Sequence, residues 1–299
     1  MVVARNGRVD IGGCDKFQSS EFEIRTYRLG LLRMTSPQDH NRKAWDARVR
    51  AQARFTRPAP DEEFANPLAA VDAAGWLGPS IAGKNVLCLA SGGGRQGALY
   101  AAAGARVTVV DISAEMLAID RQVAAERSLA LRAIEGSMDD LSVLQPASFD
   151  IVVQPVSTCY VPDVLTVYRQ VARVLVPGGL YISQHKQPTS LQASTEPSPR
   201  GYELVEPYYR RGPLPPVAGS PHREAGTLEF LHRWEELLGG MCRAGFAIED
   251  VIEPVHGDEA AEIGSFGHRS RYVAPYVRIK ARRLSNAPGA APAARVWLP

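Results

Sequence analysis

The stretch VLCLASGGGRQGALYAAAGARVTVVD, from Val86 to Asp111, decides the fold class of this chain. The apolar run that ends at Leu89 predicts a strand buried on both faces, since a half-exposed strand would alternate polar and apolar residues. Three consecutive glycines follow, then an alanine-rich helix that Gly104 ends, then a second apolar strand closed by Asp111. Strand, glycine loop, helix and strand in this order predict the opening unit of an α/β fold.

The same alternation continues downstream, and five strand–helix units in succession predict a doubly wound, mostly parallel sheet. We expect seven strands with helices on both faces. Further strands are predicted within 131–136, 148–156, 180–186, 247–254 and 272–282. Further helices are predicted within 41–54, 67–76, 113–128, 162–176 and 228–246.

The chain divides into one domain and two flanking segments. Residues 1–33 show no periodic apolar face and are predicted to be a flexible N-terminal extension. Residues 34–283 are predicted to form a single domain. Within it, 186–226 has eight prolines and little periodicity, which predicts an inserted lid or substrate loop. The Ala/Pro-rich tail 284–299 is predicted to be disordered.

Composition excludes several classes of function. A net charge of +2 on 299 residues is too small to favour nucleic acid or a membrane surface as a partner. No apolar run approaches the length of a membrane span. The four cysteines show no C-x-x-C spacing, which predicts no metal site, no disulfide framework and a reducing cytoplasmic location.

The glycine loop fits two classes of cofactor. Gly92, Gly94 and Gly97 match G-x-G-x-x-G. Asp111 follows about 20 residues further along the chain, which is the sequence spacing of a carboxylate that binds ribose hydroxyls. A nicotinamide dinucleotide and S-adenosylmethionine (SAM) are both bound by folds that open in this way. The turn GSMDDL, 136–141, follows the third strand at the same sheet edge, where Asp139 could accept a hydrogen bond from the amine of adenine.

The ordered set of motifs resembles the class I SAM-dependent methyltransferase family over roughly residues 41–283. The matching segments are VLCLASGGGRQG, VTVVDIS, GSMDDL, SFDIVVQPVSTCYVPD and RVLVPGGLYIS. A helix that ends in R-x-L-x-P-G-G before a strand is especially typical of that family.

The resemblance implies a Rossmann-like fold and SAM as methyl donor, with S-adenosylhomocysteine (SAH) as product. It implies that the loop passes under the methionine part, that Asp111 holds the ribose, and that NRKAWDARV, which contains Trp45, closes over the cofactor. The cofactor-binding residues so implied are Ala90, Ser91, Gly92, Gly93, Gly94, Asp111, Ile112, Met138, Asp139, Gln154, Pro155 and Trp45.

One position departs from the family pattern. The family's loop usually begins with Asp or Glu, which meets the amino group of SAM, whereas this chain has Ala90. Backbone carbonyls near Ala90 and Gln154 are then expected to face that ammonium group.

Two alternatives remain open at this point. The first is an NAD(P)-dependent oxidoreductase, which would use the loop and Asp111 but gives no role to the 136–141 turn. Such an enzyme also requires a proton donor set such as Tyr-x-x-x-Lys, and no Lys lies four residues after Tyr160. A protein that binds SAM without catalysis would share every motif.

The methyl acceptor is predicted to be a small molecule. The N/D-P-P-Y and Pro-Cys motifs of nucleobase enzymes are absent, since the equivalent stretch reads QPVSTC. Tyr160 and His185 follow or end strands and are the candidate catalytic residues, because a histidine can act as a base near neutral pH. Tyr208, Tyr209 and Arg210 in the long loop are the candidate substrate-binding residues.

Overall fold

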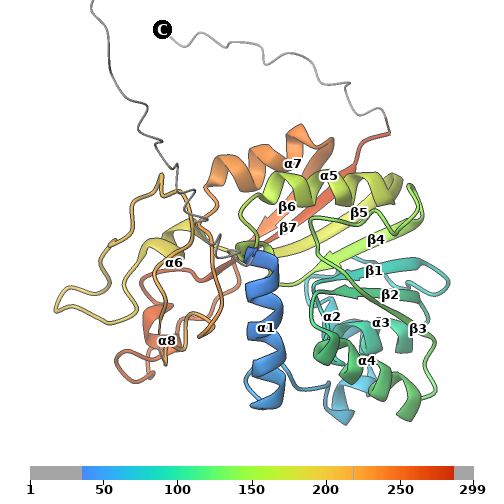
Figure 1. Ribbon diagram of the computed structural model, residues 1–299, viewed down its shortest axis with the longest axis horizontal. Helices are drawn as coiled ribbons and strands as arrows, with labels where there is room; N and C mark the ends of the chain where they lie inside the picture. The colour runs from blue at the N-terminus through green and yellow to red at the C-terminus, as the bar shows by residue number, and fades with distance from the viewer. Residues whose placement is uncertain (1–35, 218, 286–299) are drawn as a thin grey trace, which may run out of the picture. The chain divides into compact units, whose positions relative to one another are not determined.

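The computed structural model describes residues 36–217 and 219–285, in which helices cover a seven-stranded sheet (Figure 1). The predicted extension 1–33 and residues 286–299 of the predicted tail lie outside this part of the chain. The strands are β1 (Asn85–Leu89), β2 (Arg106–Asp111), β3 (Leu131–Glu135), β4 (Phe149–Gln154), β5 (Leu175–Lys186), β6 (Phe246–Ile252) and β7 (Tyr276–Arg283).

The strands lie in the order β3-β2-β1-β4-β5-β7-β6. The first five are parallel to their neighbours, and β7 runs antiparallel between β5 and β6. This confirms the predicted doubly wound, mostly parallel sheet. The chain leaves β1 in one direction toward β2 and later returns on the other side as β4, so ligands are expected at the carboxyl ends of β1 and β4.

The helices are α1 (Pro37–Arg50), α2 (Pro67–Val71), α3 (Gln96–Ala102), α4 (Ala114–Glu126), α5 (Val164–Val174), α6 (Pro188–Gln192), α7 (Gly240–Arg243) and α8 (Phe266–Arg269). Short 3₁₀ turns lie at Asp61–Ala65 and Thr158–Tyr160, and a π turn lies at Glu235–Gly239. Figure 1 shows α5 and α7 on one side of the sheet and α2, α3 and α4 on the other.

Each face of the sheet buries its own apolar cluster. Leu87 and Leu89 pack with Val167 and Tyr168 of α5 on one face, whereas Cys88 packs with residues of α3 and α4 on the other. Successive residues of one strand therefore enter opposite clusters, which is why β1 is apolar throughout.

Two helix predictions differ from the structure. The predicted helix 41–54 begins earlier, because Pro37 occupies its first turn and the Ser36 side chain caps it by accepting a hydrogen bond from the Asp39 amide at 3.0 Å. The predicted helix 228–246 is helical only from 235, since the backbone of its first residues pairs elsewhere: the Phe230 amide donates to the Cys159 carbonyl at 2.7 Å.

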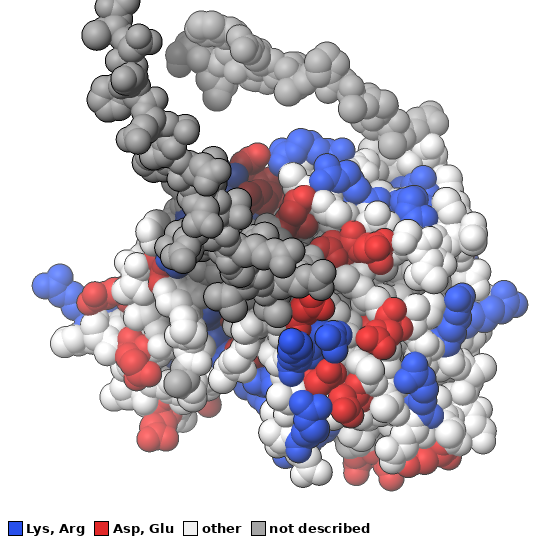
Figure 2. Space-filling view, in the orientation of Figure 1, with Lys and Arg blue, Asp and Glu red and all other residues white. Residues whose placement is uncertain are grey.

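The surface carries both signs of charge. On the face shown in Figure 2, Lys and Arg side chains are interspersed with Asp and Glu side chains. Among residues 36–217 and 219–285, no helix is both long enough and apolar enough to cross a membrane.

Candidate active site

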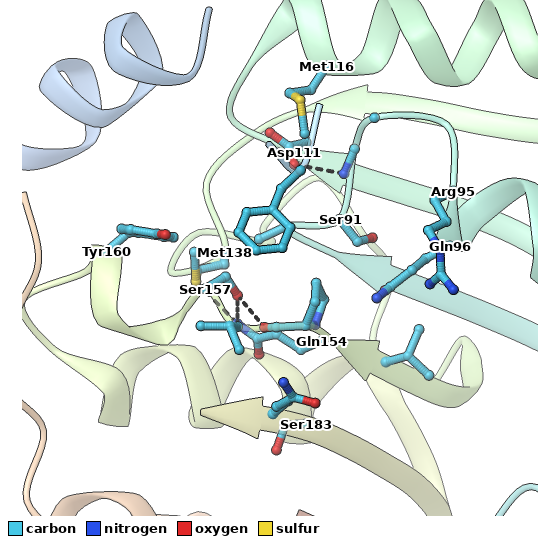
Figure 3. A pocket seen from close by; sticks show the side chains of 18 of the residues that line it. Ser91, Arg95, Gln96, Asp111, Met116, Met138, Gln154, Ser157, Tyr160 and Ser183 are labelled. Atoms are coloured by element: carbon cyan, nitrogen blue, oxygen red, sulfur yellow. Dashed lines mark hydrogen bonds between the residues drawn. The ribbon is translucent and has the colours of Figure 1, made fainter. Parts of the chain in front are cut away.

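A cavity of about 590 Å³ opens at the carboxyl ends of β1, β2, β4 and β5. Its volume lies in the range of sites that hold small molecules or cofactors. One wall, the glycine-loop side, is formed by Ala90–Gly93, Asp111, Ile112, Met116 and the 136–138 turn. The opposite wall, the Glu224 side, is formed by Tyr160, Glu224, His256, Phe266 and Tyr276. Figure 3 shows the labelled side chains around this space.

The glycine loop lies directly against α4. A Cβ added to Gly92 would lie 2.8 Å from the Cβ of Met116 and 3.1 Å from Oδ2 of Asp111, closer than real side chains pack. Gly93 has a φ of +109°, which residues with a side chain rarely adopt. The loop therefore requires glycine, and its bare backbone lines the cavity at Gly92 and Gly93, whereas Gly94 does not reach it.

Asp111 ends β2 and shapes the loop as well as lining the cavity. Its Oδ2 accepts from the Gly92 amide and its Oδ1 from the Ser113 amide, each at 2.9 Å. Burial raises the pKa of this carboxyl, and the backbone hydrogen bonds offset part of that rise. Each oxygen keeps a lone pair, so the carboxylate can also accept from two ribose hydroxyls.

Asp120 of α4 is a second carboxylate under the loop, and sequence reasoning missed it. Its side chain accepts from the amides of Gly93 and Gly94, both at 3.0 Å, and the residue has no exposed surface. Burial raises its pKa to about 7, although the two amides act in the opposite direction. The sequence did contain a sign of this role. Asp120 lies one turn after Met116 on the apolar face of α4, where a carboxylate without hydrogen-bond partners would be destabilising.

The residues expected around adenine do not all line the cavity. Ile112, Ser137 and Met138 line the cavity. Asp139 does not: its carboxylate accepts from Gln38 Nε2 at 2.7 Å and from Ser137 Oγ at 2.5 Å. Asp139 thus joins the 136–138 turn to α1, which corrects the expectation that it binds the adenine amine directly.

Gln154 and Pro155 line the cavity where β4 ends, as predicted. The Gln154 amide is fixed on both sides. Its Nε2 donates to Ser157 Oγ at 2.9 Å (Figure 3). Its Oε1 accepts from the Tyr181 hydroxyl at 2.6 Å. Ser91 differs, because its buried Oγ has no hydrogen-bond partner among the residues of the described domain. Ser91 lines the cavity, and its Oγ has almost no exposed surface and lies beside the Cys88 thiol.

Helix α1 contributes to the cavity wall. Trp45 lines it, as predicted, and its ring contacts Tyr160 edge to face at a centroid distance of 5.6 Å. Asn41 is buried, and its side chain donates to the carbonyls of Tyr160 and Leu228 at 2.9 and 3.0 Å. α1 is thereby fastened to two segments far away in the sequence.

Tyr160 lines the cavity, but it is not a base. Its hydroxyl donates to Glu224 Oε2 at 2.8 Å, and burial and the Glu224 charge raise its pKa well above the usual value. Tyr160 therefore stays a neutral phenol at physiological pH, and its proton is directed to Glu224.

His185 does not line the cavity, which contradicts the prediction that it takes a proton from the acceptor. Its ring nitrogens bond to the hydroxyls of Thr158 and Ser183, both at 2.8 Å, and it is 1% exposed. Burial, together with His232, lowers its pKa to about 3. Its side chain packs among Thr158, Ser183 and the ring of Tyr168, which keeps it inside the domain.

The predicted substrate residues of the long loop also lie elsewhere. Tyr208 accepts from the Trp234 amide at 3.3 Å, Tyr209 is 75% exposed, and Arg210 pairs with Glu206 at 2.7 Å. None of the three lines the cavity. Of the described residues in 186–226, Glu224 does.

Several lining residues carried no sequence signal, because they come from segments without a motif. They are Arg54, Phe55, Arg57, His256, Phe266, Tyr276 and Arg278; Arg95 and Gln96 also line the cavity and were not predicted, although they lie within the glycine-loop motif. Phe266, Tyr276 and His256 contact one another, with centroid distances of 5.4 to 6.1 Å. The Glu224 side thus has an aromatic surface, and Trp45, Phe55, Trp76 and Tyr100 add aromatic rings elsewhere in the cavity wall.

Similarity to known proteins includes the segment that contains the glycine loop. A model of the "Methyltransferase domain" family matches residues 87–183. The uncharacterized methyltransferase YbaJ of Bacillus subtilis is 36% identical over 233 residues, which are 73% of this chain and 91% of that protein. A ubiquinone biosynthesis O-methyltransferase of Xanthomonas campestris is 35% identical over 105 residues, 35% of this chain and 44% of that protein.

A solved structure agrees in fold. The SAM-dependent methyltransferase of Mesorhizobium loti has a TM-score of 0.57 and 24% identity, and the match covers 74% of this chain and all of that chain.

The observed cradle also fits SAM. The loop backbone admits close approach at Gly92 and Gly93, the buried Ser91 hydroxyl lacks a partner within the described domain, and the Asp111 carboxylate faces the same space. When bound there, SAM supplies an electrophilic methyl group. With the likeness to YbaJ over most of both chains, these features decide against a nicotinamide cofactor: the chain belongs to the class I SAM-dependent methyltransferase family and is an enzyme that uses SAM.

Proposed function

We propose that this enzyme transfers the methyl group of SAM to a small-molecule acceptor bound on the Glu224 side of the same cavity. The observation that carries this proposal is the continuity of the cavity, which reaches from the glycine loop to Glu224, Phe266 and Tyr276. A donor and an acceptor held in one enclosed space meet the main requirement for methyl transfer, which is a fixed approach geometry without water.

The chain's own residues then act mainly by position. Ser91, Gly92 and Asp111 hold the cofactor, Gln154 and Pro155 form the floor between the two sides, and Trp45 covers them from α1. We assign no general base, because His185 is outside the cavity and Tyr160 keeps its proton. The enzyme contributes orientation and exclusion of water.

A small acceptor suits the surface as well as the cavity. The charges on the face seen in Figure 2 are mixed, whereas a nucleic-acid enzyme presents a basic face along the path of the backbone. The similarity to the ubiquinone biosynthesis O-methyltransferase covers 105 residues, so it supports the shared cofactor chemistry and leaves the acceptor to be inferred from the cavity.

The test uses SAM labelled in its methyl group. The enzyme is incubated with labelled SAM and a cell extract that dialysis has separated into a dialysable and a retained fraction. We expect label to enter compounds of the dialysable fraction only. Label that enters the retained fraction alone would show that the acceptor is a macromolecule and would refute the proposal.

A further inference from the structure

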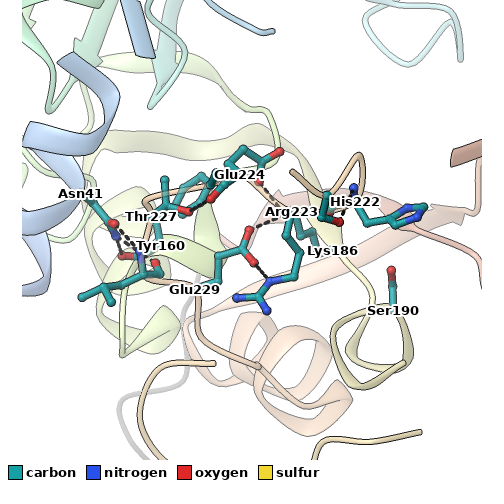
Figure 4. Close-up of polar contacts among 12 residues, drawn as sticks. Asn41, Tyr160, Lys186, Ser190, His222, Arg223, Glu224, Thr227 and Glu229 are labelled. Carbon is teal, nitrogen blue, oxygen red and sulfur yellow. Dashed lines mark hydrogen bonds and ion pairs between the residues drawn. The ribbon is translucent and has the colours of Figure 1, made fainter. Parts of the chain in front are cut away.

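Glu224 belongs to a buried network of four charged side chains at the end of the cavity (Figure 4). Lys186, the last residue of β5, donates to Glu224 Oε2 at 2.7 Å and to Glu229 Oε1 at 2.5 Å. Arg223 also binds Glu229 through its Nε. The side chains of Lys186 and Glu229 are 3% and 0% exposed, and that of Glu224 is 10% exposed. Of these four, Glu224 lines the cavity.

The network holds Glu224 as an acceptor of hydrogen bonds. Burial opposes its ionisation, but the charge of Lys186 and the hydrogen bonds from Lys186 and Tyr160 outweigh burial, so the pKa of Glu224 is lowered. Both donors reach the same oxygen, Oε2. A carboxylate has about four lone-pair positions, and the network leaves part of that capacity for a ligand.

Charge balance indicates which kind of group Glu224 receives. Lys186 contacts both glutamates and Arg223 contacts Glu229, whose pKa is raised by burial, so the network carries no net negative charge. Four further cations, Arg54, Arg57, Arg95 and Arg278, line the cavity, together with the carboxylates of Asp72 and Asp111. A cationic ligand would meet these arginines, whereas a neutral hydroxyl needs only an acceptor and no net negative field.

The rest of this wall favours a flat ligand. Phe266 and Tyr276 lie 6.1 Å apart between ring centroids, and His256 contacts both. Burial, Arg278 and Arg54 lower the pKa of His256, so its ring is neutral at pH 7. Such aromatic surfaces pack against planar rings.

We propose that Glu224 selects the acceptor by taking a hydrogen bond from a neutral hydroxyl group on a planar ring that packs against Phe266 and Tyr276. The proposal rests on the proposed function, since it names the class of small molecule that the Glu224 side of the cavity receives. Lys186 and Tyr160 are positioning residues, because both donate to Glu224 Oε2 and so fix the orientation of the carboxylate.

Matched pairs of probes test this selection. The full chain saturated with SAH is titrated with phenol and anisole, catechol and veratrole, and 2-naphthol and 2-methoxynaphthalene, with ligand-observed NMR as readout. In each pair the ether keeps the ring and lacks the hydroxyl donor. We expect at least one hydroxy compound to bind about tenfold more tightly than its ether, which is the effect of one hydrogen bond to a charged group.

The Glu224→Gln variant separates charge from shape. Lys186 and Tyr160 would hold the oxygen of the new amide, which turns its NH₂ donor toward the cavity, so the preference for the hydroxyl compound should be lost. Glu206→Gln is the matched control, because Glu206 belongs to the same long segment, is also ion-paired, and does not line the cavity. This control should keep the preference.

Calorimetry with SAH is run on all three proteins and reports the cofactor site independently. If SAH binds and no hydroxyl preference exists in the wild type, or if the preference survives in Glu224→Gln, the assignment to Glu224 is wrong while the methyltransferase function stands. If, in the dialysis experiment, label from SAM enters only macromolecules, the proposed function itself is refuted.

Discussion

The two sides of the cavity bury carboxylates in opposite ways. On the glycine-loop side, Asp111 and Asp120 accept hydrogen bonds from backbone amides, and no cation contacts either of them within the described domain. On the Glu224 side, Glu224 and Glu229 contact the cations Lys186 and Arg223. The first arrangement shapes a loop, and the second joins the end of β5 to the segment around 222–229.

The difference appears in the pKa values. Backbone amides are neutral dipoles, so they offset only part of the cost of burial, and the pKa of Asp120 rises to about 7. A full positive charge does more at Glu224, whose pKa falls, whereas at the fully buried Glu229 burial outweighs Lys186 and Arg223 and the pKa rises. The cofactor side is therefore expected to respond to pH near neutrality, whereas Glu224 stays ionised.

The largest expected effect is the loss of the central cation. In Lys186→Met, Glu224 would lose the cation that it contacts and Glu229 would keep only Arg223, so we expect the free energy of unfolding to fall by about 3–5 kcal/mol. Urea unfolding at pH 7 measures it. Lys280→Met is the control, since Lys280 pairs with the partly exposed Glu249 at 3.4 Å, and it should cost less than about 1 kcal/mol. Equal losses in both variants would contradict the special role of the network.

The next effect concerns the cofactor. Asp111→Ala removes a carboxylate that lines the cavity and holds the Gly92 amide, so SAH binding should weaken by about 1.5–3 kcal/mol. Isothermal titration calorimetry gives the value. Asp140→Ala, which alters an exposed carboxylate just after the 136–138 turn, should bind SAH like the wild type. Unchanged affinity in Asp111→Ala would mean that other groups hold the ribose.

A smaller effect follows from Asp120 and is seen only when pH varies. Ionised Asp120 can accept both loop amides, whereas the protonated acid places a hydroxyl against one of them. With a pKa of about 7, SAH should bind up to about tenfold more weakly at pH 6 than at pH 8. Asp120→Asn should remove this dependence. Cys88, Asp111 and Arg121, the other titratable groups near Asp120, remain in the variant, so a dependence that persists belongs to one of them.

The same pKa predicts the opposite trend for stability. A carboxyl whose pKa is higher in the folded than in the unfolded chain stabilises the fold fully at low pH, and this contribution is lost as pH rises through about 7. The melting temperature of the wild type should therefore fall between pH 5 and pH 8 by more than that of Asp120→Asn.

The smallest effect is expected in the long loop. Tyr209→Ala and Arg210→Ala change exposed or surface-paired side chains outside the cavity, so the rate of methyl transfer to the dialysable acceptor should stay within about twofold. A large loss of rate would return these residues to the substrate site.

Local sequence was sufficient for the fold and for the floor of the cofactor site. The apolar run before Ala90, the three glycines and Asp111 are adjacent in the chain, and their spacing alone specifies a strand, a tight loop and a carboxylate at one sheet edge. The predicted contributions of Met138, Gln154 and Pro155 to the cavity wall follow from the same rule, because each comes just after or at the end of a parallel strand.

Tertiary structure alone decided the residues whose partners are distant in the chain. Glu224 acquires its role because β5 delivers Lys186 next to a segment 38 residues further on, and no period or motif encodes that meeting. His185 shows the converse: its type suggested a base, but packing against Thr158, Ser183 and Tyr168 buries it and lowers its pKa. Sequence determines which side chains can do chemistry, whereas packing determines which of them share a cavity and which lose their charge to burial.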